Sequence, residues 1–112
     1  MRARRFGYAP LALADLADIH TYLSQAASVA VANRVVDRIR GHIRRQRETP
    51  LSGAPRPDLA DGCRLTVNGR YVIYYAIVGE NMTVLRVLHH ARDRDAIMGG
   101  VQEEAASFEA FA

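Results

Sequence analysis

The strongest constraint on the fold is a series of three apolar, β-branched segments separated by two turn signals, in the second half of the chain. The first turn signal, Asn68-Gly69, is a dipeptide typical of two-residue β-hairpins. The second is Gly79-Glu80-Asn81, another cluster of turn-forming residues. The pattern therefore predicts an antiparallel meander of three strands, at residues 63–67, 70–78 and 82–90.

This meander is apolar on both faces, which a sheet with one solvated face would not be. A helical layer can cover only one of the two faces. Large bare apolar patches are rare on monomers, so we expect the second face to be covered by the end of the chain or by another protein. On the middle strand, Tyr71, Ile73, Tyr75 and Ile77 should alternate with Val72, Tyr74 and Ala76; on the last, Val84, Arg86 and Leu88 should oppose Leu85 and Val87.

The first half of the chain predicts a short strand followed by a helical hairpin. Residues 4–8 read as the strand, and Pro10 is well placed in the first turn of a helix that should end near Ala26. In this helix Asp15 and Asp18 are expected on the solvated side. Ser28 is a plausible N-cap for a second helix, whose apolar stripe continues to Ile43.

Residues 48–62 are rich in proline and glycine and predict a loop. After the meander, Asp93 or Asp95 could cap a short helix that ends at Met98. We therefore expect an α+β fold of order β-α-α-β-β-β, in which the helical hairpin packs on a small antiparallel sheet. The expected division is a domain at residues 1–98 and a tail at residues 99–112.

The charge pattern, a basic body followed by an acidic tail, indicates an anionic partner or a tail that shields the body. The 112-residue chain carries 15 cations, all of them Arg, and a net charge of +3. Arg presents a planar fork suited to carboxylate or phosphate. Cys63 is the only cysteine, which fits a reducing compartment. The early apolar run is interrupted by acids and is too short for a membrane span, so we expect a cytoplasmic protein. The histidines lack metal-site spacing, and we expect no metal or other cofactor.

Several motifs, taken in order, resemble the ParE/RelE superfamily of bacterial toxins. The first helix carries Ala12-x-x-Asp15-Leu16-x-x-Ile19-x-x-Tyr22. Pro50-x-x-Gly53 and Gly62-x-Arg64 follow the second helix. Tyr71-x-Ile73-x-Tyr75 and Leu85-Arg86-Val87-Leu88-His89-x-x-Arg92-Asp93 are similar to the last two strands and their exit. The resemblance spans about residues 3–98, and the last motif looks most like the ParE branch.

This resemblance implies the toxin of a type II toxin–antitoxin module. A small, acidic, partly disordered antitoxin would wrap the toxin and neutralise it in a hetero-oligomer. The ParE branch implies a non-enzymatic inhibitor of DNA gyrase, as found in plasmid stabilisation. The RelE branch implies a metal-independent nuclease that cuts mRNA on the ribosome. A third alternative is a non-toxic interaction protein on the same scaffold.

The candidate site residues lie mainly at the exit of the last strand. RNA cleavage would need a base, an acid and cations for the phosphorane charge. The available set is His89 or His90 as the base, with Arg64, Arg86 and Arg92 as the cations. The last tyrosine is Tyr75, in mid-strand, so the tyrosine that nucleases of the RelE branch carry near the carboxy terminus is missing. We therefore favour binding, and expect target or antitoxin contacts from Arg64, Arg86, His89, Arg92, Arg94 and Tyr74.

Arg86 has two possible roles. As a structural residue it would pair with an acid, and we expect Asp93 or Asp95 to be that acid. As a functional residue it would meet the antitoxin or the target. The three tyrosines Tyr71, Tyr74 and Tyr75 are more typical of core and cross-strand packing than of base stacking.

Overall fold

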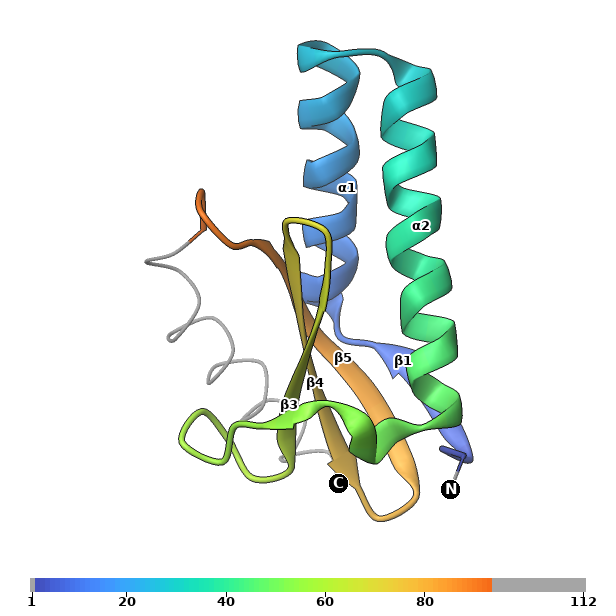
Figure 1. Ribbon diagram of the computed structural model, residues 1–112, viewed down its shortest axis with the longest axis vertical. Helices are drawn as coiled ribbons and strands as arrows, with labels where there is room; N and C mark the ends of the chain where they lie inside the picture. Colours follow the sequence, from blue (N-terminus) through green and yellow to red (C-terminus); the bar gives the residue numbers. More distant parts are fainter. Residues whose placement is uncertain (1, 94–112) are drawn as a thin grey trace.

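The protein has one α-helical hairpin packed on one mixed sheet, in a computed structural model that describes residues 2–93 (Figure 1). The predicted α+β class and element order are confirmed. The elements are β1 (Arg5–Tyr8), α1 (Pro10–Ala26), α2 (Val29–Glu48), the 3-10 turn η1 (Pro50–Ser52), β2 (Ala54–Pro55), β3 (Cys63–Asn68), β4 (Tyr71–Val78) and β5 (Asn81–His89).

The described strands form a five-stranded sheet in the order β1-β5-β4-β3-β2. The predicted meander β3-β4-β5 is antiparallel, whereas β1 runs parallel to β5, which makes the sheet mixed. The segment predicted as a loop also contains η1 and the edge strand β2. Pro55 has no backbone N–H to donate, and it is tolerated in β2 because an edge strand forms hydrogen bonds with a neighbouring strand on one side only.

The hairpin between β3 and β4 lies one residue later than the sequence predicts. Asn68 pairs with Tyr71, so the loop is Gly69-Arg70 and not Asn68-Gly69. Gly69 has φ +59°, a conformation that glycine adopts without steric cost. The shift places Arg70 in the turn itself, where its side chain is exposed.

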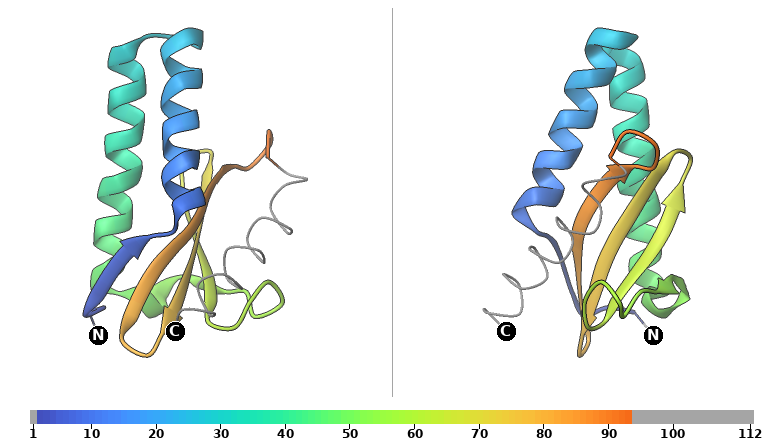
Figure 2. Two further views of the ribbon diagram at one scale, coloured as in Figure 1. Left: turned by 180° about the vertical axis from the view of Figure 1, so that it is seen from behind. Right: turned by 90° about the vertical axis from the view of Figure 1, so that its left-hand side faces the viewer.

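The helical hairpin covers one face of the sheet, and its closed end extends beyond it (Figures 1 and 2). The Ser28 side chain accepts a hydrogen bond from the Val31 backbone N–H at 3.1 Å, which confirms the predicted N-cap. Between hairpin and sheet lies the larger core cluster, which includes Leu16 and Ile19 from α1 and Ile39 and Ile43 from α2.

A buried tyrosine ties the loop after α2 to the sheet. The Tyr75 hydroxyl donates to the Pro50 carbonyl at 2.7 Å and accepts from the Gly53 N–H at 3.1 Å. A side chain at position 53 would collide with this hydroxyl, so glycine is required there. Arg64 donates to the carbonyls of Leu51 and Gly53 at 2.9 and 2.8 Å. Pro50 and Gly53 of the Pro50-x-x-Gly53 motif, and Arg64 of the Gly62-x-Arg64 motif, thus have structural roles.

The second face of the sheet is also apolar, as predicted. The buried cluster there contains Cys63, Tyr74, Ala76, Leu85 and Leu88, together with Leu59. Leu59 comes from the loop before β3, a contribution that the sequence did not predict. The predicted cover of this face by the end of the chain involves residues outside those described.

The faces of β4 are as predicted, but those of β5 are not. Val84 and Val87 lie in the helix-side cluster, whereas Leu85 and Leu88 lie in the second-face cluster. The register between β4 and β5 shifts at Tyr74/Tyr75, and this β-bulge breaks the strict alternation. The predicted grouping of Val84 with Leu88, and that of Leu85 with Val87, is therefore wrong, whereas Arg86 and Leu88 keep the same face by register, opposite Tyr74 and Val72.

Some predictions concern the part of the chain beyond Asp93. The short helix through Met98, the boundary at residues 98 and 99, the tail at residues 99–112 and the placement of Arg94 all lie outside the described residues. Within residues 2–93, no helix has the length and apolar character needed to cross a membrane.

Candidate functional site

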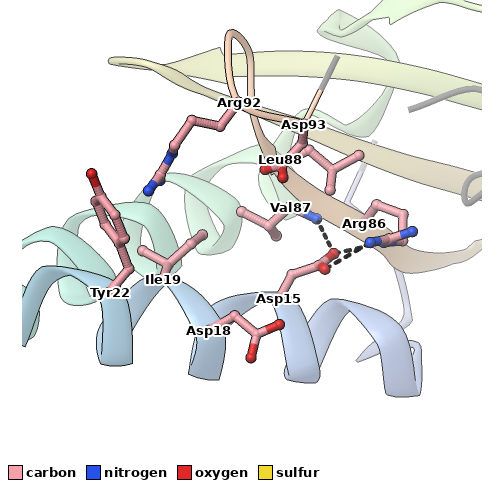
Figure 3. A pocket seen from close by; sticks show the side chains of 9 residues that line it. All are labelled: Asp15, Asp18, Ile19, Tyr22, Arg86, Val87, Leu88, Arg92 and Asp93. Atoms are coloured by element: carbon pink, nitrogen blue, oxygen red, sulfur yellow. Dashed lines mark hydrogen bonds and ion pairs between the residues drawn. The ribbon is translucent and has the colours of Figure 1, made fainter. Parts of the chain in front are cut away.

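The exit of β5 and one face of α1 enclose a hollow of about 270 Å³ (Figure 3). Its position follows from the chain path. β1 pairs with β5 only as far as Val84, and the chain then turns directly into α1. The helix therefore takes the place beside β5 that β1 has left. We call this site the α1–β5 hollow; it is lined by Asp15, Asp18, Ile19, Tyr22, Arg86, Val87, Leu88, Arg92 and Asp93.

The floor of the hollow is a buried ion pair between Arg86 and Asp15. The Arg86 guanidinium binds both carboxylate oxygens, at 2.7 Å from Nε and 2.8 Å from Nη2. Asp15 also accepts a hydrogen bond from the Val87 backbone N–H at 2.9 Å. The two side chains are only 13% and 10% exposed. Figure 3 shows the carboxylate placed between the guanidinium and the strand backbone.

This pair corrects two predictions. Asp15 is not on the solvated side of its helix, and among the described residues the acid that binds Arg86 is Asp15 and not Asp93. The other predicted acid, Asp95, lies outside the described residues. The physical reason is the free edge of β5: an N–H beyond the reach of β1 needs an acceptor, and an Asp on the adjacent helix supplies one. A buried pair of this kind is costly to break, at about 3–5 kcal/mol when one partner is removed.

The rim of the hollow is a contact between Arg92 and Tyr22. The Arg92 guanidinium carbon lies 3.9 Å from the centre of the Tyr22 ring, a cation–π geometry. Tyr22 is 50% exposed, and Arg92 is exposed as well. This contact therefore presents a cation and an aromatic ring to solvent, unlike the buried pair beneath it.

The turn after β5 fixes the position of Arg92. Asp93 accepts a hydrogen bond from the His89 N–H at 2.7 Å, and His89 Nδ1 accepts from the N–H groups of Ala91 and Arg92 at 3.2 and 3.1 Å. Burial, and then the nearby positive charge of Arg92, lower the pKa of His89 below its ordinary value of 6.5. His89 is therefore neutral at neutral pH, and Nδ1 acts as an acceptor.

The other predicted site residues lie elsewhere. Arg64 is bound to the loop carbonyls at the other side of the sheet. Tyr74 is buried on the second face, with 4% exposure, and burial raises its pKa. Of the predicted site residues within residues 2–93, Arg86, His89 and Arg92 are brought to the β5 exit, and Arg94 lies outside this range.

The four residues of the nuclease alternative do not form one cluster. Arg64 pairs in register with Tyr75, whereas His89 pairs with Tyr71, four residues earlier on β4. This register separates the backbone positions of Arg64 and His89 by about 13 Å along the strands and about 10 Å across them. Arg86 is turned toward Asp15 on the helix side. Within residues 2–93, no group of three His, Cys, Asp or Glu side chains is arranged to hold a metal ion.

Sequence reasoning missed two residues of the site, Asp15 and Tyr22. Both belong to the motif of the first helix and are seven residues apart, so they lie on the same helical face. The last motif places Arg86 and Arg92 opposite them. The two motifs are thus complementary in space, and the i, i+7 spacing of an acid and an aromatic residue was the available signal.

The sequence and the fold are similar to those of known proteins. A family model described as ParE toxin of type II toxin-antitoxin system, parDE, matches residues 7–94. A solved chain from the chromosomal ParDE TA system of P. aeruginosa superimposes with a TM-score of 0.67 at 19% identity. The match covers 78% of this chain and 96% of that chain, and at this identity it shows a shared fold. No curated protein matches the chain.

Proposed function

This chain belongs to the ParE toxin family of type II toxin–antitoxin systems, and from that membership we propose that it arrests growth by binding an essential target in the cytoplasm. The proposed target is DNA gyrase. A cognate antitoxin, a small, acidic and partly disordered protein, neutralises the toxin by forming a hetero-oligomer with it.

The observation that carries the proposal is the separation of the residues a nuclease would need. Arg64 is bound to loop carbonyls, Arg86 is bound to Asp15, and His89 uses Nδ1 to fix a turn. General acid–base cleavage requires these groups within hydrogen-bond reach of one phosphate. By contrast, an exposed Arg92 on Tyr22 is suited to contact a protein, because Arg and Tyr are enriched in interface hot spots.

The test combines growth and biochemistry. Induced expression should arrest a bacterial culture, and co-expression of the adjacent reading frame should restore growth. The purified protein should block supercoiling by gyrase while leaving mRNA on translating ribosomes intact. Cleaved mRNA with normal supercoiling would contradict the proposal and favour the RelE-type alternative. Unimpaired growth on induction would favour a non-toxic interaction protein.

A further inference from the structure

A second cleft lies on the other side of the Arg92–Tyr22 contact. It has a volume of about 350 Å³ and lies between α1, the β3–β4 turn and the β5 exit. We call it the Arg70–Arg92 cleft; it is lined by Tyr22, Leu23, Arg70, Tyr71, His89 and Arg92. It shares only Tyr22 and Arg92 with the α1–β5 hollow.

The two cavities differ in charge. The α1–β5 hollow is lined by three carboxylates, from Asp15, Asp18 and Asp93, and these outnumber its two guanidinium groups. None of the residues that line the Arg70–Arg92 cleft is acidic, and two of them are arginines. The cleft is therefore a local concentration of positive charge.

Both cations of the cleft are available to a ligand. Arg70 and Arg92 are exposed, and neither forms an ion pair with another residue in the described part of the chain. Arg92 is held in place by the Tyr22 ring and by the His89 turn. Arg70 is held by the two-residue loop, and its carbonyl accepts from the His90 N–H at 2.9 Å. The Arg92 guanidinium, already placed on the Tyr22 ring, loses less entropy on binding a carboxylate, and the Arg70 backbone holds a second cation at the same cleft.

The remaining walls are apolar and aromatic. Tyr71 is buried, and its ring meets the His89 ring edge-on at 5.4 Å. Leu23 is half-buried. Because His89 Nδ1 accepts two backbone N–H groups, the proton of the neutral ring is assigned to Nε2, which is left as a donor. The cleft thus offers donors for one anionic group next to a surface for an apolar side chain.

We propose that the Arg70–Arg92 cleft binds an acidic side chain of the antitoxin, with a neighbouring apolar side chain packed on Leu23 and Tyr22; this inference rests on the proposed function. The cleft fits a peptide better than a nucleic acid. Nucleic-acid affinity comes from many cations that follow a phosphate backbone, whereas this cleft holds two cations over an apolar floor.

The test measures the affinity of the full chain for the protein of the adjacent reading frame. Arg70→Glu and Arg92→Glu should each raise the Kd about tenfold or more, because each places a like charge against the bound acid. Arg44→Glu makes the same charge change at an exposed position of α2 outside the cleft and should leave the Kd within about threefold. Replacing the contacting acid of the antitoxin with Arg should restore affinity for Arg70→Glu.

The outcomes separate the two proposals. If the wild-type chain does not bind the adjacent protein, the proposed antitoxin and the cleft assignment both fail. If the wild type binds and both cleft variants bind equally well, only the cleft assignment is overturned. Retained antitoxin binding together with lost binding of a single-stranded RNA oligonucleotide would also overturn it, in favour of a nucleic-acid ligand. Denaturant midpoints near that of wild type confirm that the variants are folded.

Discussion

Arg86 on β5 and Arg92 in the turn that follows it are six residues apart and contact the same face of α1, yet their surroundings are opposite. Arg86 meets a carboxylate and is largely excluded from water, with 13% of its side chain exposed. Arg92 meets an exposed aromatic ring at the surface. Two cations from one motif therefore serve different purposes: the first joins helix to sheet, and the second is presented to a partner.

The largest expected effect comes from removing the carboxylate of the buried pair. Asp15→Ala removes the carboxylate that binds the Arg86 guanidinium and the Val87 N–H, and should reduce the free energy of unfolding by about 3–5 kcal/mol. Urea denaturation measures the change. The exposed Arg4–Glu80 pair is the control, since Glu80→Gln should change stability by less than about 1 kcal/mol. Equal effects of the two changes would contradict the structural role of Asp15.

Arg86→Lys should have a smaller but clear effect. Lysine keeps the charge but cannot bind both carboxylate oxygens through a planar fork, so we expect a loss of about 1–3 kcal/mol of stability. The same denaturation experiment measures it. Arg92→Lys is the matched control and should leave the midpoint near that of wild type. A fully stable Arg86→Lys protein would show that charge alone, without the bidentate geometry, joins α1 to β5.

Tyr22→Ala should affect stability little and recognition more. An exposed cation–π contact contributes about 0.5–1 kcal/mol, so the loss in unfolding free energy should not exceed that range. Without the ring, Arg92 loses its support, and growth inhibition should weaken. Colony counts after induction, at equal protein levels on immunoblots, measure the effect. Full toxicity would remove the Arg92–Tyr22 contact from the target-binding surface.

The smallest expected effect is a pH dependence from His89. Its folded pKa lies below 6.5, so the folded state favours the neutral ring. The unfolded chain then binds more protons as pH falls, and stability should decline as pH drops from above 6.5 toward the lower folded pKa. His89→Gln should flatten this decline. His42, whose pKa is also lowered, chiefly by burial, gives the matched variant His42→Gln. An NMR titration that places the His89 pKa above 6.5 would contradict this expectation.

The sequence predicts the elements of this fold better than it predicts the pairs between them. Proline, serine and glycine mark the starts of helices and the turns through local chemistry, so the bounds of α1 could be predicted. The two faces of β4 could be predicted from the alternation of side chains along a strand. The partner of Arg86 could not be predicted in this way, because Asp15 lies 71 residues away in the sequence and its burial depends on where β1 leaves β5. The bulge at Tyr74/Tyr75 likewise leaves no local pattern in the sequence, and it puts Val84 and Leu88, which were predicted to share a face, on opposite faces.

The candidate site shows the same limit. The cations at the β5 exit were predicted from their motif. The motif did not show that Arg86 forms a buried ion pair, whereas Arg92 lies exposed on the Tyr22 ring. Arg70 was not a predicted site residue because a one-residue shift of the hairpin places it in the turn. Spatial neighbours on α1, above all Tyr22, complete the site.

The most direct test of the division between the two arginines is to measure unfolding free energy and antitoxin affinity for Arg86→Ala and Arg92→Ala side by side. Arg86→Ala should lose about 3–5 kcal/mol of stability. Arg92→Ala should stay within about 1 kcal/mol of wild type while its Kd rises about tenfold or more. A destabilised Arg92→Ala protein, or one that binds the antitoxin as tightly as wild type, would contradict the account.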